Sequence, residues 1–408
     1  MGKMNSKMRR LSVCAAVTAC AIVVLPTEGH ANPPTGQESA NIRLRIPTPS
    51  TNDDPLYDPV SEQGQQARGM YITGPFVRVL GVDAVINRIQ LARLDTAVID
   101  MKDGAGRVTY DTQIEILEPQ QRNYLGDVGA LVRKLKENGI YTIARIVCFA
   151  DPQLPARHPE LAVLDNRRNR RNRPWTSWGT AGTWLDPYNT ANHDMVIELA
   201  REAESFGFDE VQLDYVRWPV DDGTQYANYP AHTDEPRWSV LREFLRRMDV
   251  ALRIPIGVDV FGLTAFDFGN PRPLGQKLDE WTDYVEVISP MLYMNSMRTW
   301  GRGQTERDRQ LIEAGVTQLR RRIGPHTVIR PYLQAFEEGA DDPGPMFIAR
   351  QIQGARRGRA DGYLFWHPGS RYTMLYQAAR GAARGMLQPF PLGRRGRARR
   401  AALAAQEN

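Results

Sequence analysis

The chain has 408 residues, and its 42% hydrophobic and 24% charged residues are ordinary globular values that fit one large domain with terminal extensions. The formal net charge is +5, but residues 1–31 carry +3 and residues 392–408 carry +4, so the body between them is slightly acidic. The net positive charge therefore comes from the ends of the chain, and it gives no reason to expect that residues 32–391 bind nucleic acid.

The N-terminal segment, residues 1–31, has the pattern of a secretory signal peptide. Basic residues within 7–10 precede an apolar run over 11–26 that is too short for a comfortable membrane span. Small residues before position 32 favour cleavage after Ala31. We therefore expect an exported protein, periplasmic or extracellular, with no stable transmembrane span once the signal is removed.

The three cysteines are informative about export and about metal binding. Cys20 also fits a lipoprotein signal, but residues 21–25 remain apolar, which suits the apolar core of a signal peptide better than the start of a mature chain. Cys14 lies within the signal as well, so removal of the signal leaves Cys148 as the single cysteine, inside an apolar run. An intrachain disulfide and a cysteine-rich metal site are then excluded, and a buried thiol is expected.

Three further segments follow the signal. Residues 32–66 are rich in Pro, Thr, Ser, Asn and Asp without periodicity and are predicted to be a flexible linker. Residues 67–388 are predicted to form the folded domain. Residues 389–408 are predicted to be a basic disordered tail.

Strand and helix patterns alternate through the predicted domain. The expected strands cover 69–73, 96–101, 141–149, the first half of 209–219, 255–261, 284–293, 327–334 and 361–366. The expected helices cover 77–91, 128–138, 191–206, 238–253, 306–323, 345–356 and 372–386, with a short one at 278–281. Eight such strands predict an α/β protein with a (β/α)8 TIM barrel. The alternative, a doubly wound open sheet, would favour a Gly-rich dinucleotide loop after the first strand, and none follows it.

The stretch 209–219 combines a buried strand with polar side chains. Val211 and Leu213 share one face, whereas Gln212 and Asp214 share the other. Burying such polar groups without partners costs roughly 2–7 kcal/mol, so a face that opens onto a pocket explains them better than an ordinary core. A salt-bridged structural aspartate is the alternative.

Active sites of TIM barrels lie at the C-terminal ends of the strands. Asp214 and Asp259, on neighbouring expected strands, are the predicted catalytic pair, with Asp100 as a substitute acid. Two carboxylates with aromatic walls suit glycosidic bond cleavage, in which one protonates the leaving oxygen and the other attacks the anomeric carbon or activates water. The expected substrate-binding residues are Asp100, Lys102, Arg145, Gln212, Tyr215, Arg217, Tyr293, Gln334 and Trp366.

Two further expectations concern these residues. Neighbouring barrel strands lie about 4.8 Å apart, which favours the ~5–5.5 Å carboxyl separation of a retaining enzyme with Asp214 as nucleophile. Arg217 or Lys102 is expected to help keep Asp214 ionised, and apolar neighbours are expected to raise the pKa of Asp259. No His-x-His, His-Glu-x-x-His or Gly-x-Ser-x-Gly pattern occurs in the sequence, so we expect no metal site and no cofactor.

The connection after the third expected strand is unusual. An arginine-rich run over 165–173 precedes Trp175, Trp178 and Trp184. It is either a solvated loop or a lip over the pocket, with tryptophan faces for sugar rings and arginines for an acidic polymer.

Eight short motifs run in order through the predicted domain: RGMYITG at 68–74, VIDMKD at 98–103, IARIV at 143–147, WLDPYN at 184–189, GFDEVQLDYVRWP at 207–219, DVFGL at 259–263, VISPMLY at 287–293 and RPYLQ at 330–334. Together they resemble one known bacterial family, which is described as a putative glycosyl hydrolase domain and is related to barrel glycosidases. The resemblance implies a TIM barrel and the activity of a glycosidase. Trp366-His367-Pro368 departs from the Trp-Asn often found there in the family.

These observations favour an exported, monomeric glycoside hydrolase that acts on a polysaccharide of the bacterial envelope or the environment. The alternative is a catalytically silent barrel that binds glycan or envelope polymer. Hydrolysis of a non-sugar envelope bond is a third possibility. Nucleic acid is not an expected partner.

Overall fold

The computed structural model describes residues 59–177, 182–220, 222–266 and 273–384. The expected signal peptide, most of the expected linker, the basic tail and Trp178 lie outside the described residues.

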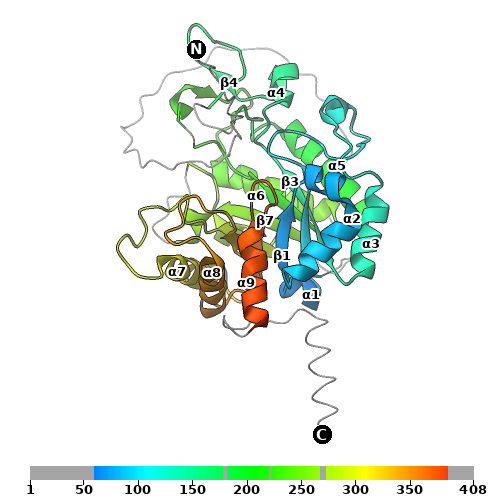
Figure 1. Cartoon of the computed structure of the whole chain (residues 1–408). Helices are drawn as coiled ribbons and strands as arrows, with labels where there is room; N and C mark the ends of the chain where they lie inside the picture. The colour runs from blue at the N-terminus through cyan, green and yellow to red at the C-terminus, as the bar shows by residue number, and fades with distance from the viewer. Residues whose placement is uncertain (1–58, 178–181, 221, 267–272, 385–408) are drawn as a thin grey trace, which may run out of the picture.

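A closed parallel sheet forms the centre of the molecule (Figure 1), as predicted. The strand order is β10-β11-β1-β2-β3-β5-β7-β8-β9, and a pairing between β10 and β8 closes the ring. The expected strands are all present, with ends that differ by a few residues. The bounds are β1 Arg68–Ile72, β2 Thr96–Lys102, β3 Tyr141–Val147, β5 Glu210–Asp214, β7 Ile256–Phe261, β8 Val287–Met291, β9 Val328–Ile329, β10 Tyr332–Gln334 and β11 Tyr363–Trp366.

The seventh barrel strand, expected as one run, is divided into β9 and β10. Pro331 lies in the interruption and has no N–H to donate to a neighbouring strand. β9 pairs with β8, and β10 pairs with β11 as well as with β8, so the two pieces fill one position in the ring.

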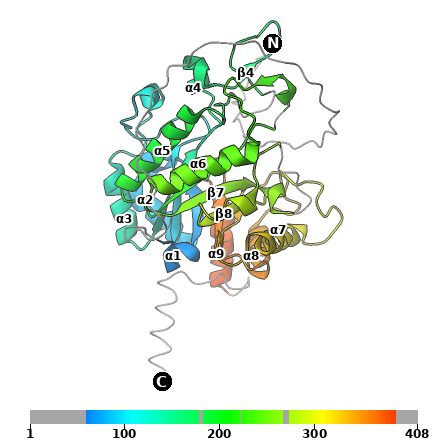
Figure 2. The same ribbon diagram turned by 180° about the vertical axis from the view of Figure 1, so that it is seen from behind.

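Helices surround the sheet, and α6, α7 and α8 are seen most clearly from behind (Figure 2). Their apolar faces pack against the outside of the barrel because they alternate with the strands along the chain. The bounds are α2 Gly74–Leu91, α3 Val128–Glu137, α5 Thr190–Ser205, α6 Arg237–Ala251, α7 Arg307–Ile323, α8 Pro345–Arg357 and α9 Thr373–Ala383, and the expected short helix is the 3-10 turn Leu278–Glu280.

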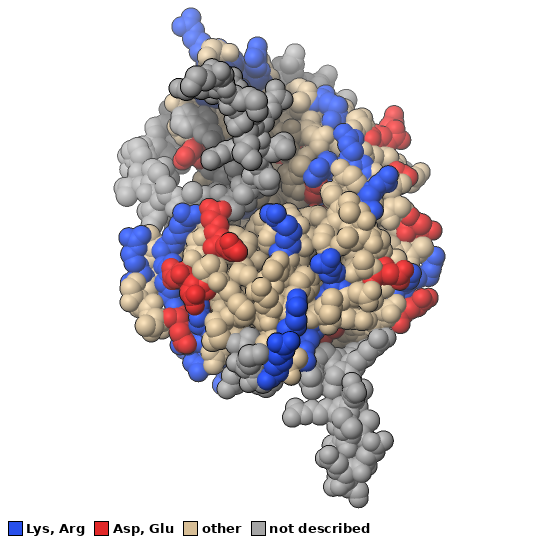
Figure 3. Space-filling view, viewed as in Figure 1, with Lys and Arg blue, Asp and Glu red and all other residues tan. Residues whose placement is uncertain are grey.

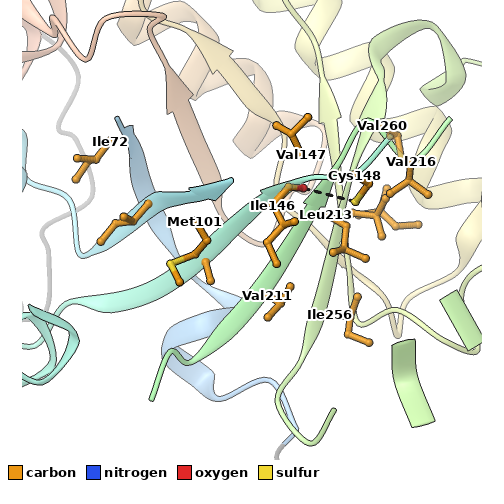
Figure 4. Packing of buried hydrophobic residues seen from close by; sticks show 14 of the residues in the cluster. Ile72, Met101, Ile146, Val147, Cys148, Val211, Leu213, Val216, Ile256 and Val260 are labelled. Atoms are coloured by element: carbon orange, nitrogen blue, oxygen red, sulfur yellow. Dashed lines mark hydrogen bonds between the residues drawn. The ribbon is translucent and has the colours of Figure 1, made fainter. Parts of the chain in front are cut away.

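The main hydrophobic core lies between the barrel strands and the helices. Figure 4 shows part of it, where Ile146, Leu213 and Val260 come from three neighbouring strands. Cys148 is completely buried in this cluster and its thiol donates to the Ile146 carbonyl at 3.6 Å. This confirms that Cys148 is a buried free thiol.

A second, smaller cluster fills the inside of the barrel, and it is not purely apolar. Glu210 and Arg330 form an ion pair there, and both side chains are completely buried. The hydroxyl of Tyr141 donates to Glu210 at 3.1 Å. The ion pair lies below the mouth of the barrel. It joins the start of β5 to a residue between β9 and β10, although Glu210 and Arg330 are 120 residues apart in sequence.

The N-terminal end of the barrel is covered by the short helix α1 (Glu62–Gln65), at the bottom of Figure 1. This helix lies within the segment that was expected to be a linker. Val60 packs with Val287 and Val328, which begin β8 and β9. A Cβ added to Gly64 would lie 2.7 Å from the Tyr141 ring, so only glycine fits there.

The long connection after β3 forms a subdomain above the barrel in Figures 1 and 2. It contains α4 (Leu154–Arg157) and β4 (Leu164–Asp165), which pairs with β6 (Ala227–Asn228). Trp175 and Trp184 are completely buried in it, and the Trp175 indole donates to the Gly223 carbonyl at 3.0 Å.

The idea that these two tryptophans present open faces to sugar is therefore wrong. Arg167 pairs with Asp165, and Arg168 and Arg171 are exposed, as in a solvated loop.

The face of the molecule drawn in Figure 3 carries charges of both signs. Lysine and arginine side chains are interspersed with aspartate and glutamate on the face seen in Figure 3. Within the described residues, no helix combines the length and the apolarity that crossing a bilayer requires.

We predict that Arg330→Met lowers the free energy of unfolding by about 3–5 kcal/mol, because Glu210 would remain buried as an uncompensated charge. Urea denaturation followed by circular dichroism measures the change. The control is Glu210→Gln with Arg330→Met, which removes both charges and should lose clearly less stability. Equal losses in the single and double variants would contradict this account of the barrel interior.

Candidate active site

A cavity opens at the C-terminal mouth of the barrel, where TIM-barrel enzymes place their active sites. Its volume, including the open mouth, is about 880 Å³. Charged groups and aromatic rings both line it. The lining residues are Arg145, Asp214, Tyr215, Arg217, Asp259, Phe261, Gly262, Leu263, Met291, Tyr293, Ser296, Met297, Tyr332, Phe336 and Trp366.

The register of the sheet places the charged groups side by side. Asp100 on β2 is the direct neighbour of Arg145 on β3. Leu213 on β5 is the neighbour of Val258 on β7, so Asp214 and Asp259 each follow by one residue and face the barrel interior together.

Arg145 links three carboxylates from three strands. Its Nη1 lies 2.6 Å from Asp100 Oδ1, its Nη2 lies 2.5 Å from Asp214 Oδ2, and its Nε lies 3.8 Å from Asp259 Oδ2. The guanidinium also lies over the Tyr71 ring, 5.2 Å from its centroid. A planar cation with donors on several edges suits this bridging position better than a lysine would.

Asp214 is held as an acceptor of hydrogen bonds. Besides Arg145, the backbone N–H of Tyr215 donates to its Oδ1 at 2.6 Å. Tyr215 has φ of 58°, in the left-handed region that non-glycine residues rarely adopt. The chain thus turns sharply just after β5, and such backbone strain is typical of active sites.

Asp259 has the opposite environment. It is 1% exposed, its contact with Arg145 is longer than a hydrogen bond, and among the described residues nothing donates to its Oδ1. Burial, followed by the negative charge of Asp214, raises the pKa of Asp259 well above its usual range. Asp214 and Asp259 thus lie beside each other in different environments. Asp214 accepts hydrogen bonds from Arg145 and Tyr215, whereas the raised pKa of Asp259 favours its protonated form.

Asp100 is buried behind Arg145 and does not line the cavity. The hydroxyl of Tyr71 donates to its Oδ2 at 2.5 Å, and Arg145 contacts its Oδ1. Burial raises the pKa of Asp100 to about 6, although the charge of Arg145 opposes the rise. Since both oxygens have partners within the protein, Asp100 is placed to orient Arg145, and it does not have the free access that a substitute acid needs.

A cluster of aromatic rings also lines the cavity. Trp366 stacks on Tyr293, with ring centroids 5.5 Å apart and an angle of 27° between the planes. Phe336 meets Trp366 edge to face at 5.4 Å. Such a cluster can hold the apolar face of a sugar ring.

Four of the expected substrate-binding residues do not line the cavity: Asp100, described above, and Lys102, Gln212 and Gln334. Lys102 is completely buried, pairs with Asp151 at 3.0 Å and donates to the Val147 carbonyl. Its ammonium is therefore used within the protein, and Arg145 is the cation that contacts Asp214. The expectation that Lys102 helps to keep Asp214 ionised is wrong.

Gln334 and Gln212 do not line the cavity either. The Gln334 side chain accepts from the Asn295 N–H and donates to the Phe336 and Glu338 carbonyls, which shapes the loops at the rim. Gln212 lies one layer below, where it accepts from the Tyr332 hydroxyl at 2.7 Å.

Sequence reasoning missed several residues of the site, notably Tyr71, Tyr332 and Phe336. Tyr71 and Tyr332 are in strands whose alternation points them inward, a signal that was present in the sequence. Phe336 lies two residues beyond β10, in a loop whose path the sequence pattern could not predict.

A family model described as "Putative glycosyl hydrolase domain" matches residues 69–372, which is more than half of the chain and includes the whole barrel mouth. No curated protein matches the sequence.

Several solved structures are similar. The PgaB (BpsB) glycoside hydrolase domain from Bordetella bronchiseptica has 15% identity and a TM-score of 0.58, over 80% of this chain and 100% of that chain. Alpha-L-fucosidase isoenzyme 2 from Paenibacillus thiaminolyticus has 13% identity and a TM-score of 0.52, over 78% of this chain and 49% of that chain. A hypothetical protein from Ruminiclostridium thermocellum ATCC 27405 has 30% identity and a TM-score of 0.42, over 47% of this chain and 97% of that chain. Because the Bordetella and Paenibacillus structures are only 15% and 13% identical to this chain, their similarity supports the fold alone.

We predict that Asp259→Asn stabilises the protein at alkaline pH. A carboxyl group whose pKa is raised by folding favours the fold below its unfolded pKa, and this contribution is lost as pH rises through the folded pKa. At about pH 8 the variant should exceed the wild type by about 1–3 kcal/mol, the cost of a buried polar group left unpaired. The difference should shrink toward about pH 4, and urea denaturation at both pH values measures it.

Asp151→Asn is the matched control, because burial tends to raise the pKa of Asp151 but Lys102 and backbone N–H groups lower it overall. That variant should lose stability at about pH 8. A loss of stability in both variants would contradict the environment described for Asp259.

Proposed function

Because the chain belongs to the putative glycosyl hydrolase domain family, we propose that it is a glycoside hydrolase that cleaves a polysaccharide with Asp214 and Asp259. The observation that carries this proposal is the pair itself: two carboxyl groups on neighbouring strands, at the mouth of a TIM barrel, with opposite environments. Glycosidases need one carboxyl group that gives a proton and one that is ionised.

Asp259 is the general acid. Its raised pKa keeps the proton available near neutral pH, and its Oδ1 has no competing donor among the described residues. The carboxyl group gives this proton to the glycosidic oxygen as the bond to the leaving sugar breaks.

Asp214 is the nucleophile. The Arg145 guanidinium and the Tyr215 N–H stabilise its ionised form and hold one orientation of the carboxylate. Its attack on the anomeric carbon forms a glycosyl-enzyme, and a water molecule deprotonated by Asp259 then releases the sugar.

We propose a retaining outcome, which the register of β5 and β7 supports. Strands that are hydrogen-bonded neighbours lie about 4.8 Å apart, which is compatible with the ~5–5.5 Å separation of retaining carboxyl groups and shorter than the ~6.5–9.5 Å of inverting ones. The shared contact with Arg145 supports the close arrangement. The stacked rings of Trp366 and Tyr293 would position a sugar ring beside the pair.

We predict that Asp259→Asn lowers kcat by about 10²–10⁴-fold on a polysaccharide identified by a glycan-library screen, because the leaving oxygen is no longer protonated. Wild-type activity should fall as pH rises through the raised pKa of Asp259, and the variant should lack this alkaline fall. Released reducing ends, measured across pH, provide the test. Asp151→Asn, which changes a buried carboxylate outside the cavity, is the control.

We predict that Asp214→Gly is inactive and that added azide restores cleavage by occupying the space of the missing carboxylate. In a retaining enzyme the product is a glycosyl azide with inverted anomeric configuration, which nuclear magnetic resonance identifies. Cleavage by Asp214→Asn at the wild-type rate would contradict the proposal. If the protein binds glycan saturably but releases no reducing ends, and if the Asp214 and Asp259 variants bind equally well, the protein is a binding protein.

We also propose that the protein is exported, which the basic and apolar pattern of residues 1–31 supports. Expression of the full chain in a bacterium should yield a secreted or periplasmic product whose N-terminus, read by mass spectrometry, is Asn32. Cys20→Ala should leave this product unchanged. Loss of processing in that variant would instead indicate a lipoprotein.

A further inference from the structure

Arg217 is the second cation of the cavity, and the mechanism above does not use it. It lies three residues after Asp214 and lines the same cavity as both catalytic carboxyl groups, although only 3% of the residue is exposed. Three aromatic rings surround its guanidinium: the centroids of Trp184, Tyr215 and Phe261 lie 4.8, 5.0 and 5.1 Å from its central carbon.

The hydrogen bonds of this guanidinium are incomplete. Its Nη1 donates to the Trp218 carbonyl at 3.1 Å, and within the described ranges no carboxylate pairs with it. Other buried arginines differ in this respect: Arg145 contacts Asp100 and Asp214, and Arg330 contacts Glu210. A guanidinium has five N–H donors, so most of those of Arg217 stay available.

The surrounding rings explain how a buried cation can be kept without a carboxylate. Cation–π contacts use the faces of the guanidinium, whereas its N–H donors lie in the plane and point outward from the edges. The rings therefore hold the cation in place and leave its edge free for an acceptor in the cavity. A planar edge of this kind matches the two oxygens of a carboxylate or of a sulfate group.

We propose that Arg217 forms an anion-binding subsite beside the catalytic pair, so that the substrate is an acidic glycan whose sugar carries a carboxylate or a sulfate ester. This inference deepens the proposed function and rests on it for the position of the substrate. The charge of Arg145 cannot serve the same purpose, because Asp100 and Asp214 already neutralise it.

The first test uses the wild-type protein and needs no cleavage. The probes are the methyl glycosides of glucuronate and galacturonate, their methyl esters, the neutral parent sugars and a 6-sulfated parent, titrated by saturation-transfer nuclear magnetic resonance. At least one acidic probe should bind about tenfold more tightly than its ester or neutral parent, the gain typical of a charge-assisted pair. The uronates and the sulfated sugar distinguish the two anionic groups. Equal affinity across all probes would overturn the proposal.

The second test assigns the preference to one side chain. Arg217→Met keeps an unbranched apolar stem against the rings but removes the charge, and it should abolish the preference for acidic probes. Arg217→Lys should restore part of it, because an ammonium keeps the charge without the planar edge. A preference that persists in Arg217→Met would overturn the assignment.

Arg237→Met is the matched control. Arg237 also lies over two rings, Trp218 and Tyr229, at 5.5 and 5.4 Å, but it does not line the cavity. Its replacement should leave the acidic preference unchanged.

Because these tests measure the binding of monosaccharides and not their cleavage, they distinguish a failure of the proposed function from a failure of the anion-binding subsite. An acidic preference without hydrolysis of any glycan would contradict the proposed function alone. Cleavage of neutral polysaccharides with an unchanged kcat/KM in Arg217→Met would contradict the subsite alone.

Discussion

The contact of one guanidinium with three carboxyl groups is the constraint on which the site depends. Arg145 hydrogen-bonds Asp100 and Asp214 and lies 3.8 Å from Asp259, so that β2, β3, β5 and β7 all contribute to one cluster. Three buried carboxylates without this cation would repel one another and would carry a large desolvation cost. Arg145 hydrogen-bonds two of them, whereas the pKa of the third, Asp259, is raised by burial and by the charge of Asp214. The unequal sharing of Arg145 thus gives one residue type different environments.

The rest of the barrel holds this cluster in place. Below it, the buried pair of Glu210 and Arg330 joins separate parts of the ring. At the lower end, Val60, just before α1, packs against Val287 and Val328. A rigid parallel ring fixes the spacing of side chains at its mouth, since neighbouring strands cannot slide without losing their hydrogen bonds. The loops at the mouth are the part of a TIM barrel that varies between proteins, and here one of them contributes Phe336 to the cavity.

Buried arginines in this molecule illustrate how context decides a role. Arg330 neutralises a buried glutamate, Arg145 contacts the carboxyl groups at the barrel mouth, and Arg217 lies between aromatic rings beside the cavity. The guanidinium is the same in each position, and the groups that surround it determine its role. The sequence alone treated Arg217 and Lys102 as equivalent helpers of Asp214, whereas the structure pairs Lys102 with Asp151.

The sequence by itself determined the barrel, because the alternation of strands and helices and the inward period of two are local patterns. It also located Asp214 and Asp259, since carboxylates near strand ends stand out within apolar runs. Only the tertiary structure decided that Arg145 is the cation shared by the carboxyl groups, that Lys102 pairs with Asp151 outside the cavity and that Trp184 packs on Arg217. The reason is physical: burial, ion pairing and pKa depend on distances between strands and loops that are far apart in the chain, and no local pattern encodes them.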